Sequence, residues 1–146
     1  MVDSLSFLEG SWIIKATNFP MWTSKKRKNP TIAYNKLSEH PPKFLDTVRY
    51  ETKYSTKKII GIDTYHSNKF IWRGKGILKI LKSEWSILEL TETILVIRFE
   101  RSLVTPAGID ILVRDNVEVS DSKQFILESL KDGILKKEEI EYLIWL

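Results

Sequence analysis

Acidic residues on predicted strands are the side chains of this chain that could act as a general acid or base. Asp110 lies on the same alternating face of its segment as Arg114, and Glu100 ends a segment rich in Ile and Val. A carboxyl group that faces a closed apolar interior has a raised pKa, which suits it for proton transfer near neutral pH. If Asp110 faces inward, its charge needs a partner such as Arg73 or Arg98.

No catalytic constellation accompanies these two carboxyl groups. His40 and His66 both lie in turn-like contexts, SEHPP and TYHSN, and no nucleophile motif is near either of them. The sequence contains no phosphate-binding loop, no dinucleotide fingerprint, no metal-ligand spacing and no cysteine. We therefore predict no catalytic residue, no metal and no cofactor, and we favour a binding protein over an enzyme.

The strand that precedes Glu100 has two candidate inward faces. One face carries Ile94 and Val96 together with Arg98 and Glu100. The other face is entirely apolar and carries Leu95, Ile97 and Phe99. Because a buried charge without a good partner costs several kcal/mol, we expect the entirely apolar face to point inward.

A run of four basic residues could bind an anionic group. Lys25, Lys26, Arg27 and Lys28 lie within a polar, proline-bounded segment at residues 18–30. Charge runs most often form a solvated surface, and this is the simpler interpretation. A nucleic-acid patch is less favoured, because no stacking aromatic residues alternate with the basic ones and the net charge is only +4.

The stretch FIWRGKG at residues 70–76 could form the wall of an apolar site. Trp72 lies on the same strand face as Gly74 and Gly76, which have no side chains to occupy the space beside its ring. The simpler interpretation is a bulge or bend in a closing barrel. The alternative is that the missing side chains leave floor space for a ligand.

The segments that would position these residues are mostly strands. From Leu8 to about Asp115, short runs rich in Ile, Val, Tyr, Trp and Thr alternate with polar or Gly/Pro turns, which predicts an all-β protein. Eight antiparallel strands, enough to close an up-and-down β-barrel, are expected at residues 11–17, 31–37, 43–52, 57–65, 69–81, 84–90, 93–101 and 108–115. An α-helix follows, capped by Ser120 or Asp121 and stopped by Gly133, and a short terminal strand ends the chain.

Length and composition limit the remaining possibilities. The 146 residues and the 42% hydrophobic content are typical of one globular domain, which we assign to residues 1–146. The absence of cysteine fits a reducing compartment, and neither a signal peptide nor an apolar run of membrane-spanning length is visible. We therefore expect a cytoplasmic protein with no membrane span and no nucleic-acid partner, and the oligomeric state stays open.

Both ends of the predicted barrel resemble the lipocalins, a family within the calycin superfamily. EGSWIIKATNFP at residues 9–20 is similar to the first motif of the family, with Gly10 and Trp12 as its characteristic pair. IDILVRD, followed by a capped helix, resembles the third motif and makes Arg114 its basic residue. The second motif is half present, because LTET at residues 90–93 keeps a Thr and an acid but lacks the Tyr.

This resemblance implies one structural end and one binding end. It implies that Trp12 closes one end of the barrel, that Arg114 packs across its indole ring as a cation–π contact, and that Gly10 lets the chain turn in beneath it. It also implies that residues 18–30 form a loop over the open mouth. The residues that we expect to contact a ligand are Trp22, Lys25, Arg27, Tyr34 and Trp72.

The function favoured by these observations is the binding or carriage of one small, mostly apolar ligand inside the barrel. The ligand that we expect is lipid-like and has an anionic head group at the basic mouth. One alternative is a barrel enzyme, an isomerase or hydratase, with Asp110 or Glu100 as the acid or base. Another is an interaction module whose barrel is filled by its own side chains. An empty apolar cavity would favour the carrier, a polar one the enzyme, and a filled barrel the interaction module.

Overall fold

A computed structural model describes residues 2–24, 26–76, 82–102, 106–115 and 123–146 of the chain. Its strands are β1 (Gly10–Thr17), β2 (Lys28–Glu39), β3 (Pro42–Glu51), β4 (Thr56–His66), β5 (Lys69–Gly74), β6 (Lys82–Leu90), β7 (Ile94–Phe99), β8 (Gly108–Arg114) and β9 (Ile144–Trp145). Its helices are the 3-10 helix η1 (Val2–Phe7) and the α-helices α1 (Pro20–Thr23), α2 (Lys123–Ser129) and α3 (Lys137–Glu141). Within these described ranges, no helix is long and apolar enough to cross a membrane.

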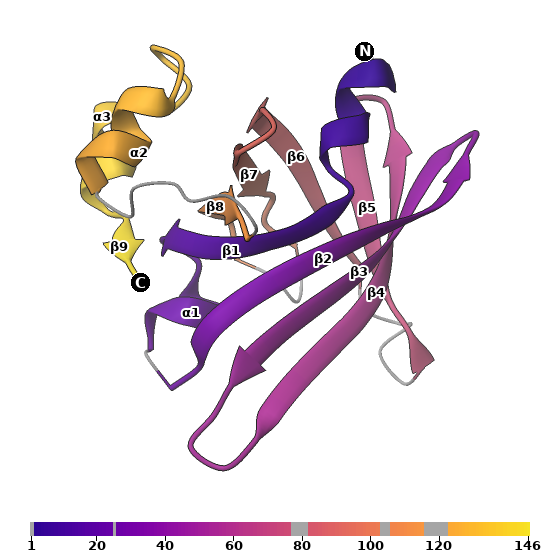
Figure 1. The fold of residues 1–146 in the computed structure, drawn as a ribbon, viewed down its shortest axis with the longest axis horizontal. Coiled ribbons are helices and arrows are strands. Elements are labelled where there is room, and N and C mark those ends of the chain that lie inside the picture. The colour runs from indigo at the N-terminus through magenta and orange to yellow at the C-terminus, as the bar shows by residue number, and fades with distance from the viewer. Residues whose placement is uncertain (1, 25, 77–81, 103–105, 116–122) are drawn as a thin grey trace.

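The first eight strands form a closed antiparallel barrel (Figure 1). Strands β2 to β8 pair in chain order, β8 pairs with β1, and β1 pairs back with β2, which closes the barrel. The ninth strand lies on β1, where Trp145 pairs with Ala16 and Ile144 with Thr17. The predicted fold, an all-β eight-stranded up-and-down barrel with a C-terminal helix and a short terminal strand, is confirmed.

Apolar residues form one core inside the barrel and a second core outside it. Leu95 and Ile97 of β7 belong to the inner core, so the entirely apolar face of this strand points inward as expected. Ile94 and Val96 face outward and are buried in the second core together with Ile126 of α2. The helices after β8 lie outside the barrel, where they cover this second apolar face (Figure 1).

The closed end of the barrel is built around Trp12. This side chain is fully buried, and its indole nitrogen donates a hydrogen bond to the carbonyl oxygen of Leu8 at 2.9 Å. Arg114 pairs with Trp12 across β1 and β8, and its guanidinium carbon lies 3.8 Å from the centre of the indole ring. Gly10 has φ +124°, and a side chain at that position would collide with the guanidinium. Gly10 therefore leaves the space in which Arg114 packs across the tryptophan.

Two strands differ most in extent from the sequence prediction. β2 begins at Lys28 rather than Thr31, and the pairing of Lys28 with Glu51 extends it into the expected loop. The register shifts between Lys28 and Thr31, which accommodates Pro30, a residue that has no amide donor. β5 ends at Gly74, and residues 77–81 of the expected longer strand lie outside the described residues.

The C-terminal helical region is also divided differently. α2 begins at Lys123, and the expected caps Ser120 and Asp121 lie outside the described residues. α2 ends at Ser129, before Gly133 (φ +79°), so the helix is shorter than expected and Gly133 does not stop it directly. α3 then forms a separate short helix before β9.

Candidate ligand-binding site

The open half of the barrel contains a cavity of about 160 Å³. It lies where β1 ends and α1 begins, and therefore at the opposite end of β1 from Trp12. Its lining is mostly aromatic and aliphatic, but it includes the polar side chains of Asp46, Ser83 and Asp110. The closed half is filled by protein side chains, whereas the open half retains space for a small molecule.

Three of the residues predicted to contact a ligand meet at this cavity. Trp22 on α1, Tyr34 on β2 and Trp72 on β5 all line it. Trp22 and Tyr34 are buried, and Trp72 is half-buried. The Trp72 indole lies over Gly61 of β4, where any side chain would collide with it. The Trp72 ring therefore occupies the space that Gly61, on the neighbouring strand, leaves open.

Asp110 faces the cavity from β8 and is only 1% exposed. Its Oδ1 accepts a hydrogen bond from the Thr17 hydroxyl at 2.6 Å, while its Oδ2 has no partner among the described residues. Burial raises the pKa of Asp110 to about 7, and the hydrogen bond from Thr17 offsets only part of this rise.

The prediction that Arg73 or Arg98 pairs with Asp110 was wrong. Neither Arg73 nor Arg98 approaches it, because both side chains point out of the barrel. Arg98 is paired with Glu139 of α3 at 2.6 Å, and Arg73 is exposed. A neutral hydroxyl thus takes the place where we expected a guanidinium, and no described residue places a counter-charge on this carboxyl group.

A second acidic group, Asp46 on β3 with Asp63 on β4, extends deeper into the barrel. Asp46 pairs with Gly61 across the two strands, so Asp63 lies diagonally across from it on the same inward face. The indole nitrogen of Trp85 donates a hydrogen bond to Asp63 Oδ1 at 2.9 Å. Burial raises the pKa of Asp46 to about 6, and burial together with the nearby Asp46 carboxyl group raises the pKa of Asp63 well above its usual value.

Our sequence reasoning missed Asp46 and Asp63, although their strands carried a usable pattern. On β3, Asp46 falls in the alternation of Phe44 and Val48, which is the more apolar face of that strand. On β4, Asp63 falls in the alternation of Gly61. An acid on the more apolar phase of a strand predicts an inward carboxyl group.

Glu100 is not part of this site. Its carboxylate pairs with Lys69 at 2.5 Å on the outside of the barrel, and both side chains are more than one third exposed. The hydrogen bond from Lys69 lowers the pKa of Glu100, which is the opposite of what a general acid needs at neutral pH. The sequence-based hypothesis of Glu100 as an acid or base is therefore wrong.

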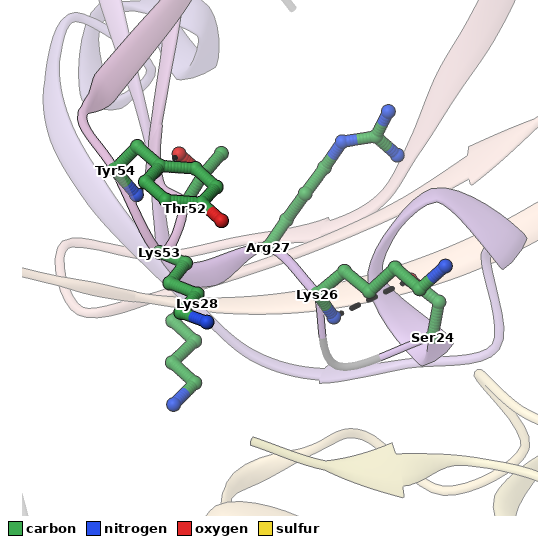
Figure 2. Close-up of a pocket in the computed structure, with 7 residues that line it drawn as sticks. All are labelled: Ser24, Lys26, Arg27, Lys28, Thr52, Lys53 and Tyr54. Atoms are coloured by element: carbon green, nitrogen blue, oxygen red, sulfur yellow. Dashed lines mark hydrogen bonds between the residues drawn. The ribbon is translucent and has the colours of Figure 1, made fainter.

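A wider depression of about 630 Å³ lies near the mouth and is strongly basic. Its lining comes from the α1–β2 connection and from the β3–β4 turn, and comprises Ser24, Lys26, Arg27, Lys28, Thr52, Lys53 and Tyr54 (Figure 2). No acidic side chain is among these lining residues. Figure 2 shows the Arg27 side chain extending away from that of Lys28. Lys25, the other basic residue predicted to contact a ligand, lies outside the described residues.

Arg27 connects the basic depression with the barrel cavity. Its guanidinium donates a hydrogen bond to the Met21 carbonyl at 3.2 Å and lies over the Tyr50 ring, 5.4 Å from its centre. Tyr50 in turn contacts Trp22 edge-on, with 5.6 Å between the ring centres. Since Trp22 lines the cavity, a ligand that extends past this indole would reach the basic side chains.

Three solved structures share this fold at low sequence identity. A siderocalin, Ex-FABP, described as functioning through dual ligand specificities, aligns at 12% identity over 78% of each chain, with a TM-score of 0.59. The bovine lipocalin allergen Bos d 2 aligns at 8% identity over 96% of this chain and 92% of its own, with a TM-score of 0.58. A deswapped triple mutant of bovine odorant-binding protein aligns at 13% identity over 95% and 93%, with a TM-score of 0.52.

The chain therefore has the lipocalin fold, as its sequence motifs indicate. No protein-family model and no curated protein matches the sequence. The likeness thus establishes the barrel architecture and does not establish the chemistry of the site, which depends on this chain's own residues.

Proposed function

We propose that this lipocalin-fold barrel binds one small, mostly apolar ligand in the cavity of its open half. The observation that carries the proposal is an aromatic-walled space, closed at one end by Trp12 and bordered at the other by Trp22. Burying a compact apolar molecule there would replace cavity surface with packed contacts, which is the main source of affinity in such sites.

The size of the cavity restricts the ligand. A volume of about 160 Å³ is close to that of an engineered apolar cavity, ~150 Å³, which binds benzene. A single ring or a short branched chain therefore fits without rearrangement. A lipid-like tail would have to leave through the mouth or displace Trp22, so a compact ligand body is favoured.

The basic mouth adds a finer preference at the outer end of the ligand. An anionic group that extends past Trp22 would meet Arg27, and beyond it Lys26, Lys28 and Lys53. These cations are in contact with solvent, so each would contribute only ~0.2–1 kcal/mol. The cytoplasmic location expected from the lack of cysteine stays a prediction, which fractionation of the source cells would test.

Titration of the full chain with ethylbenzene tests the proposal, with tryptophan fluorescence and calorimetry as readouts. We expect saturable one-to-one binding that Val48→Phe abolishes, because Val48 lines the cavity and the larger ring would fill it. Leu37→Phe is the matched control, since Leu37 is 52% exposed on β2. If ethylbenzene binds equally well to Val48→Phe with an intact circular dichroism spectrum, or if no compact aromatic probe binds, whether neutral or charged, the cavity is not a ligand site.

One observation favours a second candidate function, a barrel enzyme. Asp110 is an inward carboxyl group with a raised pKa beside a cavity, which is the arrangement expected of a general acid or base. Proton exchange into cyclopentanone in deuterated buffer, followed by NMR, would test it. Exchange faster than in buffer and lost in Asp110→Asn would support an isomerase-type enzyme, whereas exchange at the buffer rate would exclude Asp110 as a base for this carbon acid.

A further inference from the structure

The lining of the barrel cavity is acidic, and its described residues supply no counter-charge. Asp46 and Asp110 both face it, and among the described residues that line it there is no Lys, Arg or His. The two carboxyl groups are 6% and 1% exposed, so water gives them little compensation. A cavity of this composition favours an occupant that brings positive charge or hydrogen-bond donors.

The polar atoms on this lining lack partners. Asp46 Oδ1, Ser83 Oγ and Asp110 Oδ2 are all buried and make no hydrogen bond within the described part of the chain. Buried polar groups without partners are rare in native proteins, because each costs free energy comparable to a lost hydrogen bond. Three of them on one small cavity indicate that something absent from the protein itself completes their hydrogen bonding.

The surroundings favour an organic cation over a metal ion. Among the described residues, no group of three or more His, Cys, Asp or Glu side chains could hold a metal. The walls are instead aromatic, with Trp22, Tyr34, Trp72 and Trp85 around the same space. Faces of aromatic rings attract ammonium groups, and apolar rings bury the carbon skeleton that carries them.

We propose that the cavity selects a small organic ammonium ion, with an apolar ring or short chain among the aromatic walls and its ammonium group hydrogen-bonded to Asp110 and Asp46. This inference rests on the proposed function and names its ligand class. The acidic interior and the basic mouth would act on opposite ends of the ligand. An inner amine meets the carboxyl groups, and an outer anionic group, where the ligand has one, meets Arg27 and its neighbours.

A set of matched probes separates this inference from simple apolar binding. Benzylamine and ethylbenzene have nearly the same shape, and only the amine can donate charge-assisted hydrogen bonds; benzoate supplies the opposite charge. At pH 8 we expect the full chain to bind benzylamine at least about tenfold more tightly than ethylbenzene or benzoate, since a charge-assisted hydrogen bond exceeds this factor. Calorimetry measures all three affinities.

Substitutions at the carboxyl groups test which residues are responsible. Asp110→Asn and Asp46→Asn should each reduce benzylamine affinity about tenfold or more while leaving ethylbenzene affinity within about twofold. Retained ethylbenzene binding shows that each variant still folds around an intact cavity. Asp115→Asn, at an exposed position just beyond β8, is the matched control and should change neither affinity.

A pH series adds a second readout. The titratable groups around the site are Asp46 on β3, Asp63 on β4, Tyr34 on β2 and Asp110 on β8. Because the carboxyl groups must lose a proton to pair with an ammonium ion, benzylamine affinity should rise from about pH 5 to about pH 8. The rise should disappear in the double variant Asp46→Asn/Asp110→Asn.

The outcomes are distinguishable. Equal or tighter binding of ethylbenzene than of benzylamine overturns the ammonium inference and leaves the apolar-ligand function standing. Preference for benzylamine that survives both Asn substitutions overturns the assignment to these carboxyl groups. Failure of every probe to bind overturns the proposed function as well.

Discussion

At the closed end of the barrel the polar side chains of Trp12 and Arg114 have partners, whereas in the open half several buried polar side chains have none among the described residues. Trp12 donates to Leu8, and all three nitrogens of the Arg114 guanidinium donate to backbone carbonyls, those of Phe7, Glu9 and Glu92. In the open half, the second oxygen of Asp110 and the hydroxyl of Ser83 are buried and have no partner in the part of the chain that the structure describes.

This difference separates a structural site from a candidate binding site within one barrel. A fully satisfied cluster such as that around Trp12 lowers the free energy of the folded state and needs nothing further. An unsatisfied cluster costs stability, and the rest of the fold has to offset it. The closed end should therefore govern stability, and the open half should govern binding and the response to pH.

Removing the Trp12 side chain should destabilise the closed end more than any other substitution considered. We expect Trp12→Ala to lower the free energy of unfolding by about 3–5 kcal/mol, because it deletes a fully buried aromatic side chain at the barrel end. Trp72→Ala, which removes the same side chain from the half-buried cavity wall, is the control and should cost clearly less. Urea denaturation measures both. A loss below about 1 kcal/mol for Trp12→Ala would contradict its role as the plug.

The pH dependence of stability should reveal the cost of the open half. Burial raises the pKa of Asp110 from 3.8 to about 7, so the folded protein keeps a proton that the unfolded chain releases between these values. Its contribution is therefore complete below about pH 4 and is lost as the pH rises toward about 7, with no further change above. Asp46, with its pKa raised to about 6, contributes in the same direction.

Asp110→Asn isolates this effect, because its amide oxygen can still accept the hydrogen bond from Thr17. At pH 8 we expect the variant to be more stable than the wild type by about 1–3 kcal/mol, and at pH 4 to be similar. Asp115→Asn serves as the exposed control. If the free energies of unfolding of the variant and the wild type differ by the same amount at pH 4 and at pH 8, ionisation of Asp110 costs the folded protein little.

The contact between Arg114 and Trp12 should appear as a coupling energy. In a double-mutant cycle, Arg114→Ala and Trp12→Ala should cost less together than the sum of the two, by about 0.5–2 kcal/mol. Arg114→Lys keeps the charge but loses the planar donor fork, so it should recover only part of the loss. Full additivity of the Ala variants would mean that the guanidinium and the indole do not stabilise each other.

The strands could be predicted from sequence because their determinants are local, and the closed end because its segments resemble lipocalin motifs. Strand alternation is visible within each segment, and Gly10, Trp12 and Arg114 lie in recognisable motifs at the two ends of the barrel. The start of β2 at Lys28 could not be predicted, because it depends on pairing with Glu51 across a turn.

The acidic interior depends even more strongly on non-local pairing. Asp46 and Asp63 come together because of the register of β3 and β4, which neither segment specifies alone. Asp110 joins them only when β8 pairs with β1 and the barrel closes. The placement of the inward residues Trp22, Tyr34 and Trp72 around one cavity likewise follows from barrel closure, and sequence could supply only the expectation that each faces a ligand.

The basic mouth is a third region of the barrel, and its solvent-exposed charges should contribute only weakly to binding. A ligand with its ring in the cavity and its other end past Trp22 would bring that end close to Arg27, with Lys26, Lys28 and Lys53 beyond it (Figure 2). We expect 4-phenylbutyrate to bind more tightly than its neutral amide, by ~0.2–1 kcal/mol for each basic residue engaged, at low salt. The preference should shrink as ionic strength rises, because exposed charges are screened within about 10 Å at 0.1 M salt.

Charge reversal of the three lysines should remove this preference for the anionic ligand without unfolding the barrel. Lys137→Glu on α3 is the control, at an exposed position outside the mouth. Equal affinities for the acid and the amide at low salt would show that the basic residues form only a solvated surface, leaving the selection of ligands to the carboxyl groups inside.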